Sequence, residues 1–162
     1  MSDHTLPEIA AVLLADTVDQ EADGGRIHLI GGGVRAIIAS ALPTMHQRLG
    51  MLVAIRTPNG SPEPAEMTVH LIDPDEDEIE LLRGELSPVS SGPGTIVWVG
   101  FNLPPLRLTR AGEYRFELRG VGATTYAVNI DVVLADEDNG EADDDHEVYF
   151  RPLRTPGADR PN

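Results

Sequence analysis

The chain has 162 residues and a formal net charge of −15, and it contains no cysteine and no lysine. This length fits one domain, which can bury roughly 70% of its unfolded surface without a disulfide or a metal. The missing residue types exclude disulfides, thiolate nucleophiles, Cys-ligated metals and Schiff-base lysines. The excess of acids disfavours phosphate backbones and anionic lipid surfaces as partners.

The N-terminal apolar run, residues 9–15, is too short for a secretory signal. Two acids, Asp3 and Glu8, precede it, and the first basic residue is Arg26. No segment approaches the ~20 apolar residues of a membrane-spanning helix. We therefore expect a cytoplasmic protein with neither a nucleic-acid nor a membrane partner.

Eight segments have the composition of β-strands, each bounded by Gly, Pro or acidic turn residues. In chain order they are residues 8–18, 25–31, 49–57, 65–73, 78–86, 94–103, 112–119 and 124–134. Short strands at this spacing predict an all-β, antiparallel, immunoglobulin-like sandwich of about 7–9 strands, occupying residues 1–134. Residues 34–41 fit either one or two helical turns or a strand, and Pro43 ends them.

Strict alternation is clearest in residues 112–119, where apolar and charged side chains take turns. A period of two places Tyr114, Phe116 and Leu118 on a buried face. The same rule points further side chains inward: Met67, Val69, Leu71, Tyr126, Val128, Ile130 and Val132. The last two strands are expected to form a hairpin. Tyr114 also matches the immunoglobulin-type tyrosine whose hydroxyl bonds to backbone a few residues upstream.

Residues 31–36 match the dinucleotide-binding pattern G-x-G-x-x-A and follow a predicted strand. A true fingerprint opens a helix and has an acid about 20 residues further on for the ribose. Pro43 arrives too soon for that helix, and the region near Arg56 has no carboxylate. We interpret the glycines as a bulge or tight bend in a sheet.

The acidic run at residues 73–78 begins like a calcium loop, with Asp73, Asp75 and Asp77 at alternate positions. An EF-hand needs Gly at its sixth position and Glu at its twelfth, where this run has Glu78 and Gly84. A solvated turn is the expected structure. An irregular calcium site using these three aspartates is the alternative.

Histidines and the single tryptophan are the other candidates for a site. No H-E-x-x-H or G-x-S-x-G pattern occurs, and His28 and His70 fall on predicted outward faces. The strand at 94–103 is apolar on both faces, so alternation does not orient Trp98, which we expect in the core. An exposed Trp98 would instead favour sugar stacking, which needs aromatic platforms at the surface.

The composition changes after residue 134: residues 1–134 carry 18 acids and 9 arginines, and residues 135–162 carry 9 acids and 3 arginines. Residues 135–147 are too acidic and too polar to fold, and we predict a disordered linker. Residues 148–162 form an aromatic and basic peptide. We predict that it anchors on a protein partner through Tyr149, Phe150, Arg151 and Leu153. Alternatively, it covers an edge of its own sandwich.

Several short stretches occur together in one order: Leu13-Leu14-Ala15-Asp16, Gly25-Arg26-Ile27-His28-Leu29-Ile30-Gly31-Gly32-Gly33, Pro43, Leu71-Ile72-Asp73-Pro74-Asp75, Asn102-Leu103-Pro104-Pro105-Leu106 and Gly112-Glu113-Tyr114-Arg115-Phe116. In this combination, roughly residues 6–134 resemble a family of short bacterial proteins, common in actinobacteria, that is described only as a domain of unknown function. The resemblance implies a cytoplasmic single-domain β-sandwich and no catalytic residues.

We therefore predict a noncatalytic protein-interaction module with no cofactor, no metal and no catalytic residues. A sandwich that binds a small ligand or calcium through loop acids is the alternative. A hydrolase is the third hypothesis and would need carboxylates, or a His and a carboxylate, converging in a deep pocket. The sequence leaves the oligomeric state open.

Overall fold

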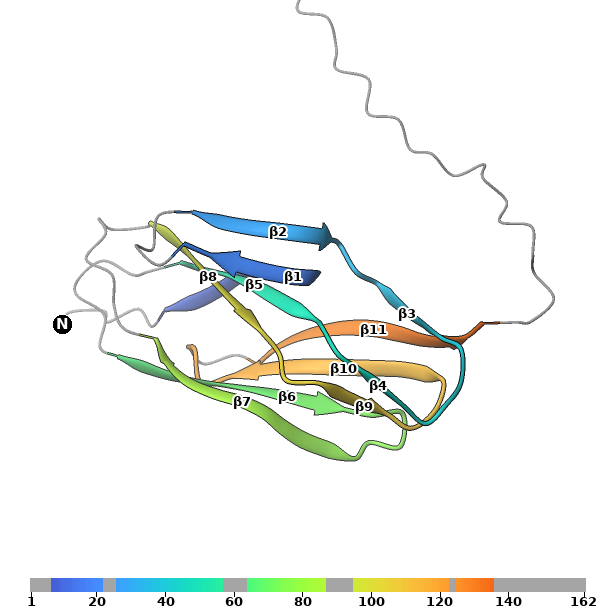
Figure 1. Cartoon of the computed structure of the whole chain (residues 1–162). Helices are drawn as coiled ribbons and strands as arrows, with labels where there is room; N and C mark the ends of the chain where they lie inside the picture. The colour runs from blue at the N-terminus through green and yellow to red at the C-terminus, as the bar shows by residue number, and fades with distance from the viewer. Residues whose placement is uncertain (1–6, 22–25, 57–63, 87–94, 123–124, 136–162) are drawn as a thin grey trace, which may run out of the picture.

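The computed structural model describes residues 7–21, 26–56, 64–86, 95–122 and 125–135 (Figure 1). These residues form two larger β-sheets stacked as a sandwich and one small two-stranded sheet. Within these ranges there is no helix long and apolar enough to cross a membrane. The predicted all-β sandwich is confirmed.

Eleven strands lie in the described ranges. Sheet 1 has the order β2-β1-β5-β8, with β1 at Glu8–Gln20, β2 at Ile27–Gly32, β5 at Gly50–Arg56 and β8 at Ile96–Asn102. Sheet 2 has the order β3-β11-β10-β6-β7, with β3 at Ala36–Ala39, β6 at Ala65–Ile72, β7 at Glu78–Leu86, β10 at Gly112–Arg119 and β11 at Tyr126–Leu134. The small sheet pairs β4 at Thr44–His46 with β9 at Leu106–Leu108.

All eight predicted strands are present, and the count exceeds the expected 7–9 because of β3, β4 and β9. These three strands have only three or four residues each, too few for an alternating pattern to stand out. The strand alternative for residues 34–41 is the right one. The strand β3 pairs with β11 in parallel, from Asp131 with Ala36 to Leu134 with Ala39, and this is the one parallel pair among the described strands.

The glycine-rich segment carries the chain from sheet 1 to sheet 2. Gly31 and Gly33 have φ values of 65° and 88°, a left-handed conformation that glycine adopts without steric cost. The backbone N–H groups of Gly33 and Val34 both donate to the carbonyl of Leu14, at 2.8 and 3.2 Å. The interpretation of this motif as a tight bend is confirmed.

The core lies between the two sheets and follows the predicted alternation. Tyr114, Phe116 and Leu118 are at most 1% exposed. Met67, Val69 and Leu71 on the neighbouring strand are also buried, as are Ile130 and Val132 after them. The strands β10 and β11 form the expected hairpin ladder, from Gly112 with Val132 to Leu118 with Tyr126.

The Tyr114 hydroxyl ties the core to the chain that precedes β10. Its oxygen accepts hydrogen bonds from the backbone N–H groups of Thr109 at 3.1 Å and Arg110 at 3.4 Å. The hydroxyl donates to the carbonyl of Arg110 at 3.1 Å. These are the upstream backbone bonds that the sequence predicts for this tyrosine.

The second half of β1 packs over part of the outer face of sheet 1. Val18 lies against Gly50 and Gly100, where an added Cβ would come within 2.7 and 2.5 Å of its side chain. The Asn102 side chain receives the Val18 N–H at 2.9 Å and donates to the Val18 carbonyl at 2.7 Å. One end of this outer face is therefore covered by the chain itself.

Candidate functional site

The acidic loop between β6 and β7 is a tight turn closed by its first aspartate. Oδ1 of Asp73 accepts the backbone N–H groups of Asp75 at 2.8 Å and Asp77 at 2.9 Å. Asp75 forms an ion pair with Arg110. No group of three or more His, Asp or Glu side chains that could hold a metal ion is found in the described part of the chain. The calcium hypothesis gains no support from these positions.

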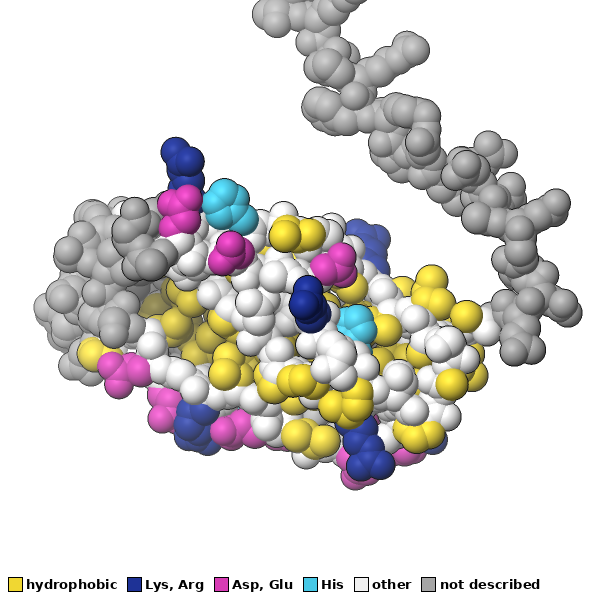
Figure 2. Space-filling view, viewed as in Figure 1, with side chains coloured by type: hydrophobic (Ala, Val, Ile, Leu, Met, Phe, Trp, Pro, Cys, Tyr) yellow, Lys and Arg dark blue, Asp and Glu magenta, His cyan; other side chains and the backbone are white. Residues whose placement is uncertain are grey.

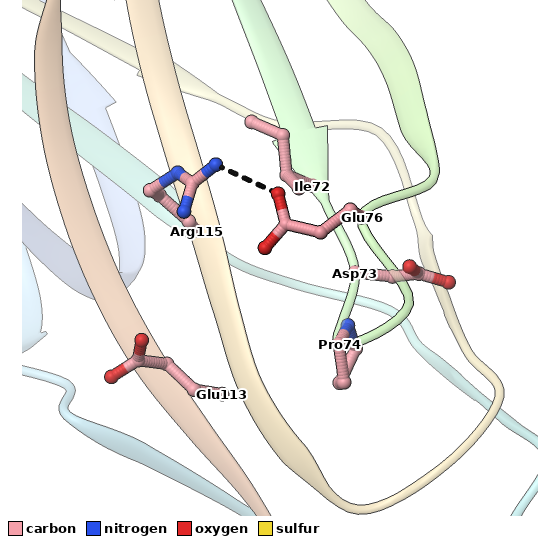
Figure 3. A pocket seen from close by; sticks show the side chains of 6 residues that line it. All are labelled: Ile72, Asp73, Pro74, Glu76, Glu113 and Arg115. Atoms are coloured by element: carbon pink, nitrogen blue, oxygen red, sulfur yellow. Dashed lines mark hydrogen bonds and ion pairs between the residues drawn. The ribbon is translucent and has the colours of Figure 1, made fainter.

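A pocket of about 280 Å³ opens beside this turn (Figure 3). Arg115 reaches across it to Glu76, with Nη2 and Oε2 3.2 Å apart. The carboxylate of Asp73 points away from this pair, and Glu113 lies at the opposite side. Because the carboxylates diverge, this pocket offers neither a metal cage nor an acid–base pair.

A second pocket of about 400 Å³ lies between β1 and β11. Its lining includes Val12, Leu14 and Val128, with Arg35 and Asp131 as charged members. The backbone N–H of Asp131 donates to the carbonyl of Arg35 at 2.9 Å, which joins β11 to the segment before β3. The volume falls within the range of small-molecule sites.

The outer face of sheet 2 carries a network of ion pairs. Glu117 lies between two arginines, with Arg115 Nε 3.0 Å from its Oε1 and Arg119 Nη2 2.6 Å from its Oε2. Arg119 also binds Glu78 through two bonds of 2.8 and 2.9 Å. His70, predicted outward and solvated, is on this face, but its side chain is only 12% exposed.

Charge pairing accounts for the titration behaviour of this network. The Arg119 hydrogen bonds lower the pKa of both Glu117 and Glu78 from the usual 4.5. Nδ1 of His70 lies 2.8 Å from Oε1 of Glu78, although the two atoms are not aligned as a hydrogen bond. The acids of this face are held ionised by neighbouring arginines, which makes it a charged structural surface.

The outer face of sheet 1 carries exposed apolar side chains where β1 does not cover it, beside the ion pair of Arg56 with Glu8. Trp98 and Ile96 on β8 are 49% and 44% exposed. Ala54 stands opposite Trp98 on β5, and Leu13 on the same face of β1 is 39% exposed. The prediction that Trp98 lies in the core is wrong, because the covering by Val18 reaches Gly100 and does not extend to Trp98.

The strand β8 is an edge strand and, among the described strands of sheet 1, pairs only with β5. The Leu103 N–H donates to the Leu49 carbonyl at 2.8 Å, so odd-numbered residues of β8 direct their backbone groups toward β5. Alternation then directs the N–H and C=O groups of Ile96, Trp98, Gly100 and Asn102 toward the open edge. This edge combines backbone groups without a strand partner and exposed apolar side chains.

The strand β8 itself carries no charge, and the nearest charged residue on the paired strand is Arg56, opposite Ile96. None of the seven residues of β8 is charged, whereas β7 carries three glutamates and an arginine. Figure 2 shows hydrophobic side chains along the region of β8 and β9, with acidic and arginine side chains along the lower margin, where β7 lies. We define the β8 edge as residues 96–102.

A second exposed apolar cluster lies where β3 pairs with β11. It consists of Ile38, Val133 and Leu134, which are 74%, 48% and 45% exposed. Ile38 and Val133 are directly paired in the parallel ladder. This cluster is smaller in strand length than the β8 edge, because β3 has only four residues.

The C-terminal site residues predicted from the sequence, Tyr149, Phe150, Arg151 and Leu153, lie outside the described residues. Sequence reasoning did not single out the β8 edge. The signal in the sequence is the uncharged run Ile96–Asn102. It did not identify an exposed edge, because a strand that is apolar at nearly every position is normally buried on both faces.

The two stacked sheets and the site geometry define an all-β sandwich with an open apolar edge. The chain belongs to DUF6941, a family of unknown function whose model matches residues 10–133. The resemblance seen in the sequence is confirmed at the level of the family. No curated protein sequence matches the chain.

Two solved structures are among those similar to this chain. A β-glucosidase from Listeria innocua in complex with glucose is 11% identical with a TM-score of 0.44, and the match covers 62% of this chain but only 15% of the β-glucosidase chain. The C-terminal domain of wzt is 10% identical with a TM-score of 0.42, covering 82% of this chain and 75% of that one. Neither similarity indicates an activity for this chain.

Proposed function

We propose that this chain is a noncatalytic, cytoplasmic protein-interaction module with an immunoglobulin-like sandwich. The observation that carries the proposal is the β8 edge, where the 49% exposed Trp98 stands on an uncharged strand. Tryptophan and other aromatic residues dominate interface energetics. An open strand edge adds backbone hydrogen bonds to an incoming extended segment.

The partner class that fits this edge is a protein segment in extended conformation. Such a segment would pair with the backbone groups of Trp98 and Gly100 and place alternate apolar side chains beside the indole. Protected edges normally carry charges, bulges or proline to prevent this kind of pairing. The strand β7 carries charges, and its pairing with β6 is irregular at Val69 and His70 of β6. The strand β8 has no charge, and its pairing with β5 is regular.

The C-terminal peptide is proposed as a second, tethered anchor. Tyr149, Phe150, Arg151 and Leu153 combine aromatic, basic and aliphatic side chains. A linker of 13 residues, 135–147, reaches at most ~45 Å when extended. A partner seated on the β8 edge would then be held at two points by one chain.

The experiment compares capture of host proteins by three forms of the full chain. Wild type is matched with Trp98→Lys on the β8 edge and with Ile79→Lys, which alters a 58% exposed side chain on β7. We expect the same partners with wild type and Ile79→Lys, and their loss with Trp98→Lys. Identical capture by all three forms, each checked for folding by circular dichroism, would refute the role of the edge.

Carbohydrate binding is a second candidate, and the exposure of Trp98 is the observation that favours it. A half-exposed indole on a sheet face is a platform on which a sugar ring can stack. Because this is the chain's single tryptophan, its fluorescence reports directly on occupancy. Titration with soluble oligosaccharides should shift the emission if this candidate is right, and an unchanged spectrum at millimolar sugar removes it.

A further inference from the structure

We propose that a second copy of this chain docks at the β8 edge, antiparallel to the first, with a two-fold axis at Val99. The two four-stranded sheets would then form one continuous sheet across the dimer. This inference deepens the proposed function, since it rests on the β8 edge being a docking edge and names the occupant.

The backbone geometry of the edge is compatible with self-pairing. Residues 96, 98, 100 and 102 direct their N–H and C=O groups outward, because the Leu103 bond to Leu49 turns the odd-numbered residues toward β5. A two-fold axis at Val99 places Trp98 opposite Gly100 of the second copy, and Ile96 opposite Asn102. Each of these is a pair of outward-directed residues, so the ladder is satisfied from both sides.

Apolar side chains also meet in this register. Trp98 lies opposite Gly100 of the second copy, which Val18 of that copy covers, so the indole would pack beside that valine side chain. On the inner face Val97 stands opposite Phe101, and Val99 stands opposite its own copy. An axis at Trp98 or at Gly100 would overlap only five of the seven residues, whereas the axis at Val99 overlaps all of them.

Electrostatics favour this edge over β2 and β7 as the meeting point of two copies, and the uncharged edge strand β3 is shorter, with only four residues. Two chains with a net charge of −15 repel each other, so contact is least unfavourable where neither carries charge. The strand β8 has no charged residue. The edge strand β2 has the Asp16 carboxylate directly beside Gly31, and β7 carries three glutamates.

Single cysteines test the register, because the natural chain has none. In the proposed dimer the two Val99 residues form a non-hydrogen-bonded pair with Cα atoms about 4.5 Å apart, within the range that a disulfide spans. The full-length Val99→Cys variant should therefore give a covalent dimer on mild oxidation. Val97→Cys and Phe101→Cys should each remain monomeric alone and cross-link when mixed.

A non-covalent measurement keeps the proposal testable if a cysteine variant does not fold. Sedimentation equilibrium of the full chain should show a concentration-dependent dimer, and Trp98→Lys should raise its dissociation constant at least about tenfold. Ile38→Lys and Ile79→Lys, which alter exposed apolar side chains elsewhere, should leave it unchanged.

Three results would overturn the inference. They are a monomer at every concentration without Val99→Cys cross-linking, equal self-linking by Val97→Cys, and loss of the dimer through Ile38→Lys instead of Trp98→Lys. If the chain stays monomeric but capture of host proteins still depends on Trp98, the proposed function stands, and a host protein rather than a second copy occupies the β8 edge. Loss of both effects would remove the two together.

Discussion

The edge strands β7 and β8 show opposite solutions to the same problem. Both end a sheet, but β7 carries three glutamates and an arginine over nine residues, while β8 has seven residues without a charge. The pairing of β7 with β6 is also irregular, at Val69 and His70 of β6. The pairing of β8 with β5 is continuous. Charges and irregularity discourage strand addition, so of these two edges β8 is the one that lacks both features, which is why we propose it as the docking edge.

The same contrast holds for the outer faces of the two sheets. Glu117 and its neighbours cover sheet 2 with paired charges. Sheet 1 presents Trp98 and Leu13 beside a region covered by Val18. The uncovered apolar part is therefore bounded on one side by the chain itself.

The largest expected effect on stability is at Gly50, where Val18 of β1 covers the outer face of sheet 1. Gly50→Ala would place a Cβ 2.7 Å from the backbone nitrogen of Val18, which has little freedom to move. We expect a loss of about 1–3 kcal/mol in the free energy of unfolding, measured by urea denaturation. Gly84→Ala on β7, where nothing lies within 4 Å, is the matched control and should change stability by less than ~0.5 kcal/mol.

Asn102→Ala tests how β1 is held over sheet 1. The substitution removes two hydrogen bonds to the Val18 backbone, of 2.9 and 2.7 Å. We expect a loss of about 1 kcal/mol, because water reaches part of this site and replaces some of the bonding. Asn129→Ala, at an exposed position of β11, serves as control. Equal stability of the two variants would contradict the role given to Asn102.

Glu117→Gln tests the charged face through its pH dependence. Because Arg119 and Arg115 lower the pKa of Glu117 below 4.5, its ionised form stabilises the fold fully above pH 4.5. That contribution declines as the pH falls below 4.5 and through the lowered pKa. The stability gap between wild type and Glu117→Gln should therefore be widest near neutrality and narrow in acid, as followed by thermal melts. A pH-independent gap would show that packing is responsible.

The smallest effect on stability is expected for Trp98→Ala on the open face. Since the indole is 49% exposed, its removal should change the free energy of unfolding by less than ~1 kcal/mol. Association should weaken at the same time, which sedimentation equilibrium measures. A large loss of stability would place Trp98 in the core of the fold and weaken the comparison between the two edges.

Alternation predicted the strands β6 and β10 most clearly, because one face of each is buried and the other is not. The bounds of β7 and β10 agree with the predicted segments residue for residue. The short strands β4 and β9 were not predicted, and β3 was one of two alternatives for residues 34–41, because the pairing of these strands depends on distant partners such as Asp131 and Arg107. The parallel pairing of β3 follows from the crossover at the glycine bend, which local pattern does not reveal.

The position of Trp98 shows where sequence reasoning stops. A strand that is apolar on both faces is normally buried on both, and β8 follows that pattern. Only part of the outer face of β8 is buried, since Val18 covers Gly100 and leaves Trp98 exposed. The position of β1 over the sheet depends on the hydrogen bonds between Val18 and Asn102, which are 84 residues apart in the sequence.

Amide hydrogen exchange on the full chain tests the open β8 edge most directly. At low concentration the amides of Trp98 and Gly100 should exchange rapidly, while those of Val97, Val99 and Phe101 are protected by pairing with β5. Raising the concentration should protect Trp98 and Gly100 as well. Protection of those two amides at every dilution would mean that the edge is already covered within one chain, and would contradict the account.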